Sequence, residues 1–137
     1  MNPETLNLNG TLECYLGADS PTIRLHTFEE ATLVRLGEVF RWLAAEPDAS
    51  LDLCGCPGLK VLGISVLRLE TVALQPRLPV EKLVGEPTSY RWSNIGKEWE
   101  EIWLLFEGML GGGGGHQYFS DERPDSALIV IAHNEDL

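Results

Sequence analysis

The residue types best suited to chemistry are few in this chain and lack visible partners. Cys54 and Cys56 are separated by one glycine and could bind a soft metal ion through their thiolates. A tetrahedral site needs four ligands, and the remaining candidates, Cys14 and three histidines, are scattered along the sequence. No serine lies in a G-x-S-x-G turn. The sequence therefore assigns no metal ligand, no cofactor and no catalytic residue, and it favours free cysteines that pack as small apolar residues.

A run of five glycines, Gly111 to Gly115, invites comparison with loops that bind phosphate. Such loops precede a helix, whose positive N-terminal end attracts the anion, whereas this run follows a predicted helix. It also lacks the lysine and the Ser or Thr of the phosphate-loop motif. We therefore expect a flexible connector. His116 and Tyr118 follow it directly and are expected to serve mainly as contact residues, because loops often carry binding.

Net charge is the extreme feature of the composition. The 137 residues include 21 acidic and 10 basic side chains, which gives a formal net charge of −11. Residues 94–137 alone contain nine acidic and two basic side chains. A negative field of this kind repels phosphate backbones and anionic lipid and attracts cationic proteins. We therefore expect neither nucleic acid nor membrane as a partner, and we expect a basic protein.

Part of this acidic charge lies on a predicted amphipathic helix from Ile95 to Leu110. Apolar side chains recur there at the spacing of one buried helical stripe; they are Ile95, Trp99, Ile102, Trp103, Phe106 and Leu110. Other sides of the helix are acidic. The carboxylates that we expect a basic partner to contact are Glu98, Glu101, Glu107, Asp121 and Glu122.

Trp92 is an aromatic candidate for the same binding surface. It precedes the predicted helix and, with Tyr90 and Arg91, forms a segment whose composition is common at protein interfaces. The alternative is a hydrophobic staple, in which Trp92 packs on the first helical turn. Ser93 and Asn94 are both competent to cap that turn.

Hydrophobic periodicity predicts the elements that must position these residues. Alternation with a period of two predicts a strand over Leu6–Leu16 and a return strand over Thr22–His26. A helix is predicted over Phe28–Ala45, beginning with a capping box between Thr27 and Glu30.

The rest of the chain is less regular. Ser50–Cys54 is a short strand candidate, and Leu59–Leu74 switches parity, which requires either a bulge or two strands. Gln75–Tyr90 contains three prolines and is expected to be irregular, with one helical turn near Val80–Leu83. The continuous apolar run Ala127–Ala132 predicts a strand that is covered on both faces.

The predicted element order is ββαββαβ, which indicates an α+β fold in a single domain spanning residues 1–137. We expect a mainly antiparallel sheet with two helices on one face, ferredoxin-like or a related two-layer sandwich. A more open meander with two helices on one face is the alternative. Met1–Glu4 contains no basic region and no apolar core, so a secretory signal is not indicated and a cytoplasmic location is expected.

Two functions from different classes fit these features. The first is a non-enzymatic acidic binding protein for a basic protein partner. In size and charge the chain resembles the immunity proteins that neutralise nuclease toxins, where opposite potentials speed encounter and a few aromatic side chains anchor the contact. The second is a small enzyme or small-ligand binder with a pocket near Gly111–Gly115 and His116. Homo-oligomerisation through an exposed sheet face or edge is compatible with either. We favour the first.

Overall fold

The computed structural model describes residues 1–17, 21–84, 88–111, 114–119 and 126–134, which form an α+β fold. The first half of the chain forms η1 (Pro3–Thr5), β1 (Gly10–Leu16), β2 (Pro21–Thr27), α1 (Glu30–Ala45), β3 (Ser50–Asp52), η2 (Leu53–Gly55), β4 (Leu59–Leu62) and β5 (Val66–Thr71), where η marks a short 3-10 helix. The second half forms β6 (Val80–Lys82), β7 (Ser89–Asn94), α2 (Gly96–Glu107), β8 (Gly115–Tyr118) and β9 (Leu128–His133).

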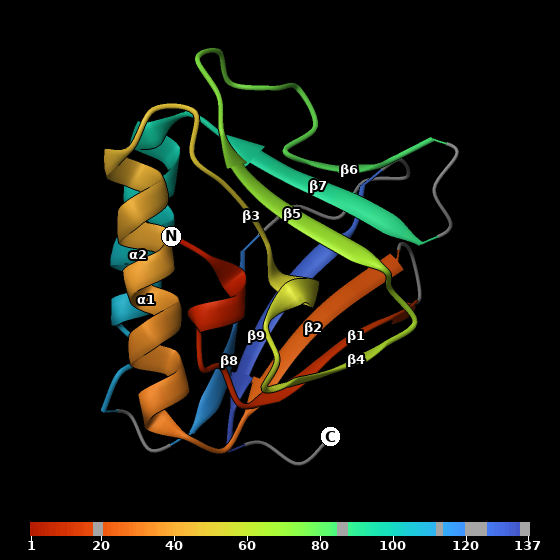
Figure 1. The fold of residues 1–137 in the computed structure, drawn as a ribbon, viewed down its shortest axis with the longest axis vertical. Coiled ribbons are helices and arrows are strands. Elements are labelled where there is room, and N and C mark those ends of the chain that lie inside the picture. Colours follow the sequence, from red (N-terminus) through yellow and green to blue (C-terminus); the bar gives the residue numbers. More distant parts are fainter. Residues whose placement is uncertain (18–20, 85–87, 112–113, 120–125, 135–137) are drawn as a thin grey trace.

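The strands form two mixed sheets. A five-stranded sheet has the order β4-β1-β2-β9-β8, and a four-stranded sheet has the order β3-β5-β7-β6. The pairs β1/β4, β2/β9 and β5/β7 are parallel, and the other pairs are antiparallel. The two helices pack against each other, and both sheets lie on the same side of this helix pair (Figure 1).

The expectation of one mainly antiparallel sheet with two helices on its face was therefore wrong, and a ferredoxin-like order is not confirmed. Two segments explain the difference. Gln75–Tyr90, expected to be irregular with a helical turn, instead contributes β6 and the start of β7. The parity switch within Leu59–Leu74 separates β4 from β5, which belong to different sheets. The additional strands complete a second sheet, which the predicted order ββαββαβ did not contain.

The two halves of the chain repeat one topology. Each half contains an antiparallel hairpin and a helix followed by two strands that pair with each other, namely β1-β2-α1-β3-β5 and β6-β7-α2-β8-β9. The first half contains one more strand, β4, which pairs with β1. In the five-stranded sheet β2 pairs with β9, which pairs with β8. In the four-stranded sheet β7 pairs with β5, which pairs with β3. Each sheet thus combines the hairpin of one half with an antiparallel strand pair of the other, and β4 extends the five-stranded sheet beside β1.

Two salt bridges occupy corresponding places in this repeat. Arg24 on β2 lies opposite Glu13 on β1, with Nη1 and Oε1 3.1 Å apart. Arg91 on β7 lies opposite Glu81 on β6, with Nη2 and Oε2 2.9 Å apart. Because both arginines lie on the hairpin strand that pairs with the other half and both glutamates on its partner strand, the two pairs allow the halves to be aligned.

The core contains an aromatic cluster around Phe40, which is 1% exposed. Its ring lies between 5.3 and 6.1 Å from four buried rings, measured between centroids; these belong to Trp92, Trp99, Phe106 and Phe119. Of the six residues predicted to form the buried stripe of α2, Trp99 and Phe106 are buried, whereas the other four are only half-buried; these are Ile95, Ile102, Trp103 and Leu110. The prediction for residues 127–132 is confirmed, since five of the six residues of β9 are buried.

The predicted helix caps are not formed. The hydroxyl of Thr27 accepts a hydrogen bond from the amide of Glu29 and donates one to the carbonyl of Asn9, so α1 begins only at Glu30. At the start of α2 the amide of Ile95 donates to the side chain of Gln75, and neither Ser93 nor Asn94 caps the helix. α2 ends at Glu107, three residues before the predicted end. Neither described helix is long and apolar enough to cross a membrane.

Candidate functional site

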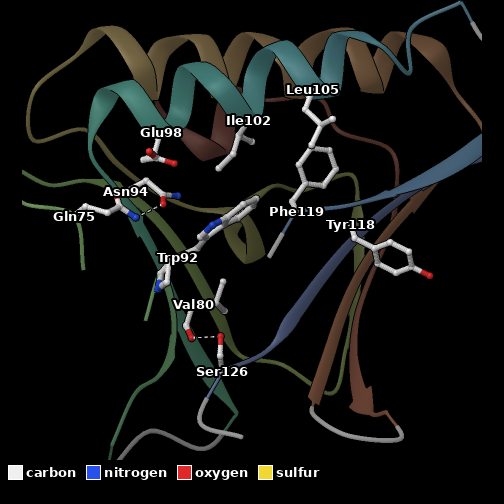
Figure 2. Close-up of a pocket in the computed structure, with 11 residues that line it drawn as sticks. Gln75, Val80, Trp92, Asn94, Glu98, Ile102, Leu105, Tyr118, Phe119 and Ser126 are labelled. Carbon is white, nitrogen blue, oxygen red and sulfur yellow. Dashed lines mark hydrogen bonds between the residues drawn. The ribbon is translucent and has the colours of Figure 1, made fainter. Parts of the chain in front are cut away.

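A pocket of about 380 Å³ lies beside α2, between this helix and strands β6 and β7 (Figure 2). We call it the α2 pocket. Its volume is within the range of about 300 to 1,000 Å³ that is usual for ligand sites. Its apolar lining comes from Pro79, Val80, Trp92, Ile102, Leu105, Tyr118 and Phe119, and its polar lining from Gln75, Asn94, Glu98 and Ser126.

Secondary structure explains why these side chains meet. Glu98, Ile102 and Leu105 follow one another at spacings of four and three residues, which places them on the same side of α2. Trp92 projects from β7 toward the helix in Figure 2. Val80 lies directly opposite Trp92 in the β6–β7 pairing and completes the floor of the pocket.

Hydrogen bonds fix the polar walls. The side-chain amides of Gln75 and Asn94 hydrogen-bond at 2.9 Å, and Gln75 also accepts from the amide of Ile95 at 2.8 Å. On the other side, the hydroxyl of Ser126 donates to the carbonyl of Val80 at 2.7 Å. Among the residues that the structure describes, none forms a hydrogen bond or an ion pair with the side-chain carboxylate of Glu98. The pocket therefore has rigid amide and hydroxyl groups and one carboxylate that is available to a ligand.

Three of the residues proposed from the sequence line this pocket, namely Trp92, Glu98 and Tyr118. Trp92 is 2% exposed on β7, so Tyr90–Trp92 is not an open surface segment. Its ring lies 4.9 Å from that of Trp99 in the first turn of α2, so the alternative, in which Trp92 packs on that turn, is confirmed. Tyr118 stands at the edge of the pocket, and its ring points away from the cavity (Figure 2).

The other proposed residues lie around the pocket or outside the described chain. Glu101 is exposed and follows Glu98 by one helical turn. Glu107 is also exposed, but nine residues separate it from Glu98, which places the two on opposite sides of α2. His116 is exposed on β8, its ring 5.2 Å from that of Tyr118, and does not line the pocket. Asp121, Glu122 and the centre of the glycine run, 112–113, lie outside the described residues.

Several pocket residues were missed from the sequence because their roles depend on tertiary pairing. Val80 sits in a stretch rich in proline, so its strand was not predicted. Leu105 carries no periodic signal, since it lies off the buried stripe. Gln75 lies in a connection between strands, where nothing local marks a side chain that bonds to the next helix. The pairing of Glu81 with Arg91, which matches that of Glu13 with Arg24, becomes evident only once β6 and β7 are placed side by side.

The thiols are poorly suited to reaction. Burial, assisted by the negative charge of Asp52, raises the pKa of Cys54 to about 12 and that of Cys56 to about 11. Burial also raises the pKa of Cys14. These thiols are therefore protonated near neutral pH and are weak nucleophiles. Within the described ranges, no group of three or more His, Cys, Asp or Glu side chains is placed to hold a metal ion.

A second hollow of about 390 Å³ lies at the C-terminal end of α1. Small residues and the exposed turn from Glu46 to Asp48 form much of its lining. It contains no aromatic side chain, so it offers fewer anchoring contacts than the α2 pocket.

The surface around the α2 pocket is both apolar and acidic. Leu105 and Tyr118, which line the pocket, are 46% and 52% exposed. Glu100 and Glu101 are exposed on the same helix. Exposed apolar side chains that gather beside a pocket are typical of binding surfaces. No protein-family model, curated protein or solved structure matches the chain.

Proposed function

We propose that this protein is a non-enzymatic binding protein, of inhibitor or immunity type, that binds a basic protein partner at the α2 pocket and the α2 surface beside it. The observation that carries the proposal is an apolar pocket with the unpaired carboxylate of Glu98 in its wall and the exposed side chains of Glu101 and Leu105 next to it. A basic partner would satisfy the carboxylates and cover the apolar lining at once.

Long-range and short-range forces would act together at this place. The net charge of −11 attracts a cationic protein and orients its approach, since complementary potentials raise association rates. The apolar pocket then supplies contacts of the kind that dominate binding energy in protein interfaces. His116 and Tyr118 are proposed as the periphery of the same surface, and Glu107, Asp121 and Glu122 are proposed only as further contacts for a basic partner.

The composition of the pocket supports a role in binding more than one in catalysis. In the described part of the chain its lining brings one carboxylate and one tyrosine together, with no histidine and no cysteine. General acid–base catalysis requires a second group within reach of the reacting proton. A pocket with one carboxylate and an aliphatic floor is better suited to recognising a side chain.

The proposal predicts that partner capture depends on two carboxylates. A variant with Glu98→Lys and Glu101→Lys, used as bait in a lysate of the organism that carries the gene, is expected to lose a basic protein that the unchanged chain retains in stoichiometric amount. The retained protein is identified by mass spectrometry and purified, and its affinity is then measured by calorimetry. Reversing both charges is expected to weaken binding by about a hundredfold, on the scale found for close charge pairs in interfaces.

The matched control is Glu38→Lys with Glu46→Lys. Both glutamates are exposed on or next to α1, and their reversal changes the net charge by the same amount. This control is expected to retain the partner with an affinity within about threefold of the unchanged chain, because distant surface charges are screened by salt. Equal losses for both double variants, or an absence of any retained basic protein, would contradict the proposal.

A small-ligand binder is the second candidate, because the volume of the α2 pocket suits a small molecule. Its location differs from the expected one, since His116 does not line the pocket. A metabolite that raises the melting temperature of the unchanged chain, and fails to do so after Leu105→Lys, would favour this candidate over a protein partner.

A further inference from the structure

A segment of the chain itself fills the place beside α1 that corresponds to the α2 pocket. Leu6–Asn9 approaches β1 there in an irregular conformation, and Leu8 is 0% exposed. The amide of Asn9 donates to the hydroxyl of Thr32 at 3.1 Å, and its carbonyl accepts from the hydroxyl of Thr27 at 2.6 Å. The first half of the molecule thus holds Leu8 by apolar packing, and it holds the backbone of Asn9 by hydrogen bonds to two threonine hydroxyls.

The strand registers identify the counterpart of Thr27. Arg24 and Arg91 both face a glutamate across their hairpins, which aligns β2 with β7. Three residues later in each strand, Thr27 corresponds to Asn94, and both are the last residue of their strand. Asn94 lines the α2 pocket.

The helices identify the counterpart of Thr32. Phe40 on α1 and Phe106 on α2 are both buried, and their rings contact each other at 5.3 Å where the helices meet. Aligning these two residues also aligns the first residues of the helices, and it makes Thr32 correspond to Glu98. The two side chains that hold Asn9 in the first half therefore correspond to two side chains of the α2 pocket.

The chain does not fill the second place with its own leucine. Leu12 and Val80 occupy corresponding positions, opposite Leu25 and Trp92 in the two hairpins. The same offset makes Pro76 the counterpart of the buried Leu8, and Leu74, the counterpart of Leu6, is 85% exposed. Of the counterparts of Leu6–Asn9, only Gln75 lines the α2 pocket, which therefore lacks the leucine that the first half places beside α1.

Charge distinguishes the two places. Beside α1, Arg35 donates a hydrogen bond to the carbonyl of Asn7 at 2.9 Å. The helix alignment makes Glu101 the counterpart of Arg35, as Glu98 is that of Thr32. Beside α2, the carboxylate of Glu98 thus stands in place of a hydroxyl, and the carboxylate of Glu101 stands in place of a guanidinium. Such a site favours a segment whose polar residues are cationic.

We propose that the α2 pocket binds an extended segment of the protein partner, in which a leucine-like side chain enters beside Ile102 and an adjacent lysine or arginine pairs with Glu98 and Glu101. This inference rests on the proposed function and specifies the chemistry that the partner presents. In the first half Thr27 bonds to Asn9, whereas the side chain of its counterpart Asn94 already bonds to Gln75 and forms a wall of the pocket.

The test uses a peptide derived from the segment that the chain binds in its first half. The sequence from Leu6 to Gly10 is Leu-Asn-Leu-Asn-Gly, and the probe is Leu-Lys-Leu-Lys-Gly with blocked ends. Titration into the full chain, followed by the NMR signals of the Trp92 indole and the Ile102 methyl groups, is expected to give saturable shifts. A peptide with serine in place of both leucines is expected to bind at least about tenfold more weakly, because it lacks the apolar anchor.

Two neighbouring leucines provide matched variants. Leu105→Lys places a cation in the pocket wall and is expected to weaken the binding of the leucine peptide by at least about tenfold. Leu104→Lys adds the same charge at a comparably exposed residue that does not line the pocket, and is expected to change the affinity by less than about threefold. Melting curves of both variants check that each remains folded.

The outcomes separate this inference from the proposed function. If the leucine peptide gives no saturable shift at Trp92, or if the serine peptide binds equally well, the segment chemistry is wrong. The proposed function still stands in that case, provided that Glu98→Lys with Glu101→Lys abolishes capture of a basic protein. If both measurements fail, both proposals are wrong. Equal weakening of peptide binding by Leu104→Lys and Leu105→Lys would also overturn the inference, because it would indicate that the peptide responds only to the overall charge of the chain.

Discussion

Cys54 illustrates how the surroundings of a residue decide its chemistry. Its spacing from Cys56 suggested a ligand pair, yet burial and the carboxylate of Asp52 raise the pKa of its thiol to about 12. The same carboxylate accepts hydrogen bonds from the amides of Cys54 and Leu67, which fixes it beside the thiol. A residue type that could bind metal or attack an electrophile is therefore held in its neutral form.

The raised pKa of Cys54 predicts a pH-dependent stability. In the unfolded chain this thiol loses its proton near pH 9, whereas in the folded chain it does so near pH 12. Between about pH 9 and pH 12 the unfolded state is therefore stabilised relative to the folded state, and the stability present below pH 9 is lost as the pH rises. Urea unfolding at pH 8 and pH 10 is expected to show this loss.

Cys54→Ala provides the comparison, because lysine and tyrosine side chains also titrate in this range. The unchanged chain is expected to lose on the order of 1 kcal/mol more than the variant between pH 8 and pH 10, a value that allows for solvent screening of this half-buried thiol. Equal losses in the two proteins would show that the thiol ionises with the same pKa in the folded and unfolded chains.

At the residue scale the sequence indicated the acidic helix but not the pocket beside it. Glu98 was recognised as a contact residue because helical geometry alone places it off the buried stripe. For Trp92 the sequence left two alternatives, an exposed contact and packing on the helix, since its burial depends on β7 pairing with β5 and β6. Local spacing predicts which side of an element a residue occupies, and only tertiary pairing determines what that side faces.

At the scale of elements, the segment before β1 acts as part of the core. A strand was predicted from Leu6, but β1 begins at Gly10 and the preceding residues pack beside α1. Alternation of apolar and polar residues is shared by a strand and by an extended segment in which alternate side chains are buried. The pattern was therefore recognised correctly, and its assignment to a sheet was wrong up to residue 9.

This role predicts a large loss of stability for Leu8→Ala. The side chain is fully buried, so its truncation leaves a cavity beside α1 and is expected to lower the free energy of unfolding by about 2 to 5 kcal/mol. Leu74→Ala, at the counterpart of Leu6 in the second half, is expected to change it by less than about 0.5 kcal/mol because that side chain is exposed. Chemical denaturation of the two variants measures both values. Similar losses for the two would contradict the assignment of Leu8 to the core.

Helices were easier to predict than strands in this chain. The core stripes of α1 and α2 were evident because a helix produces its own period within a dozen residues. β6 has three residues, Val80–Lys82, and no period can be recognised over that length. The parallel pairings of β2 with β9 and of β5 with β7 join segments from different halves of the chain, so no local signal indicated them.

At the scale of the whole molecule, each of the two sheets is built from strands of both repeated halves. The hairpin β1–β2 depends on β9 and β8, and the hairpin β6–β7 depends on β5 and β3. Neither half contains a complete sheet, and α1 and α2 share the aromatic cluster around Phe40. The single domain expected from the sequence is consistent with this arrangement, since separate halves would expose unpaired strands and apolar faces.

This arrangement predicts that the two halves fold only together. Fragments 1–72 and 73–137, divided in the connection between β5 and β6, are each expected to give the circular dichroism of a largely unfolded chain, because β2 lacks β9 in one and β7 lacks β5 in the other. Mixed in equal amounts, they are expected to form a 1:1 complex with the signal and one cooperative melting transition of the intact chain. The intact chain cleaved at an inserted protease site between residues 73 and 78 is the control and should remain associated. A cooperative transition in either fragment alone would mean that the halves are independent domains.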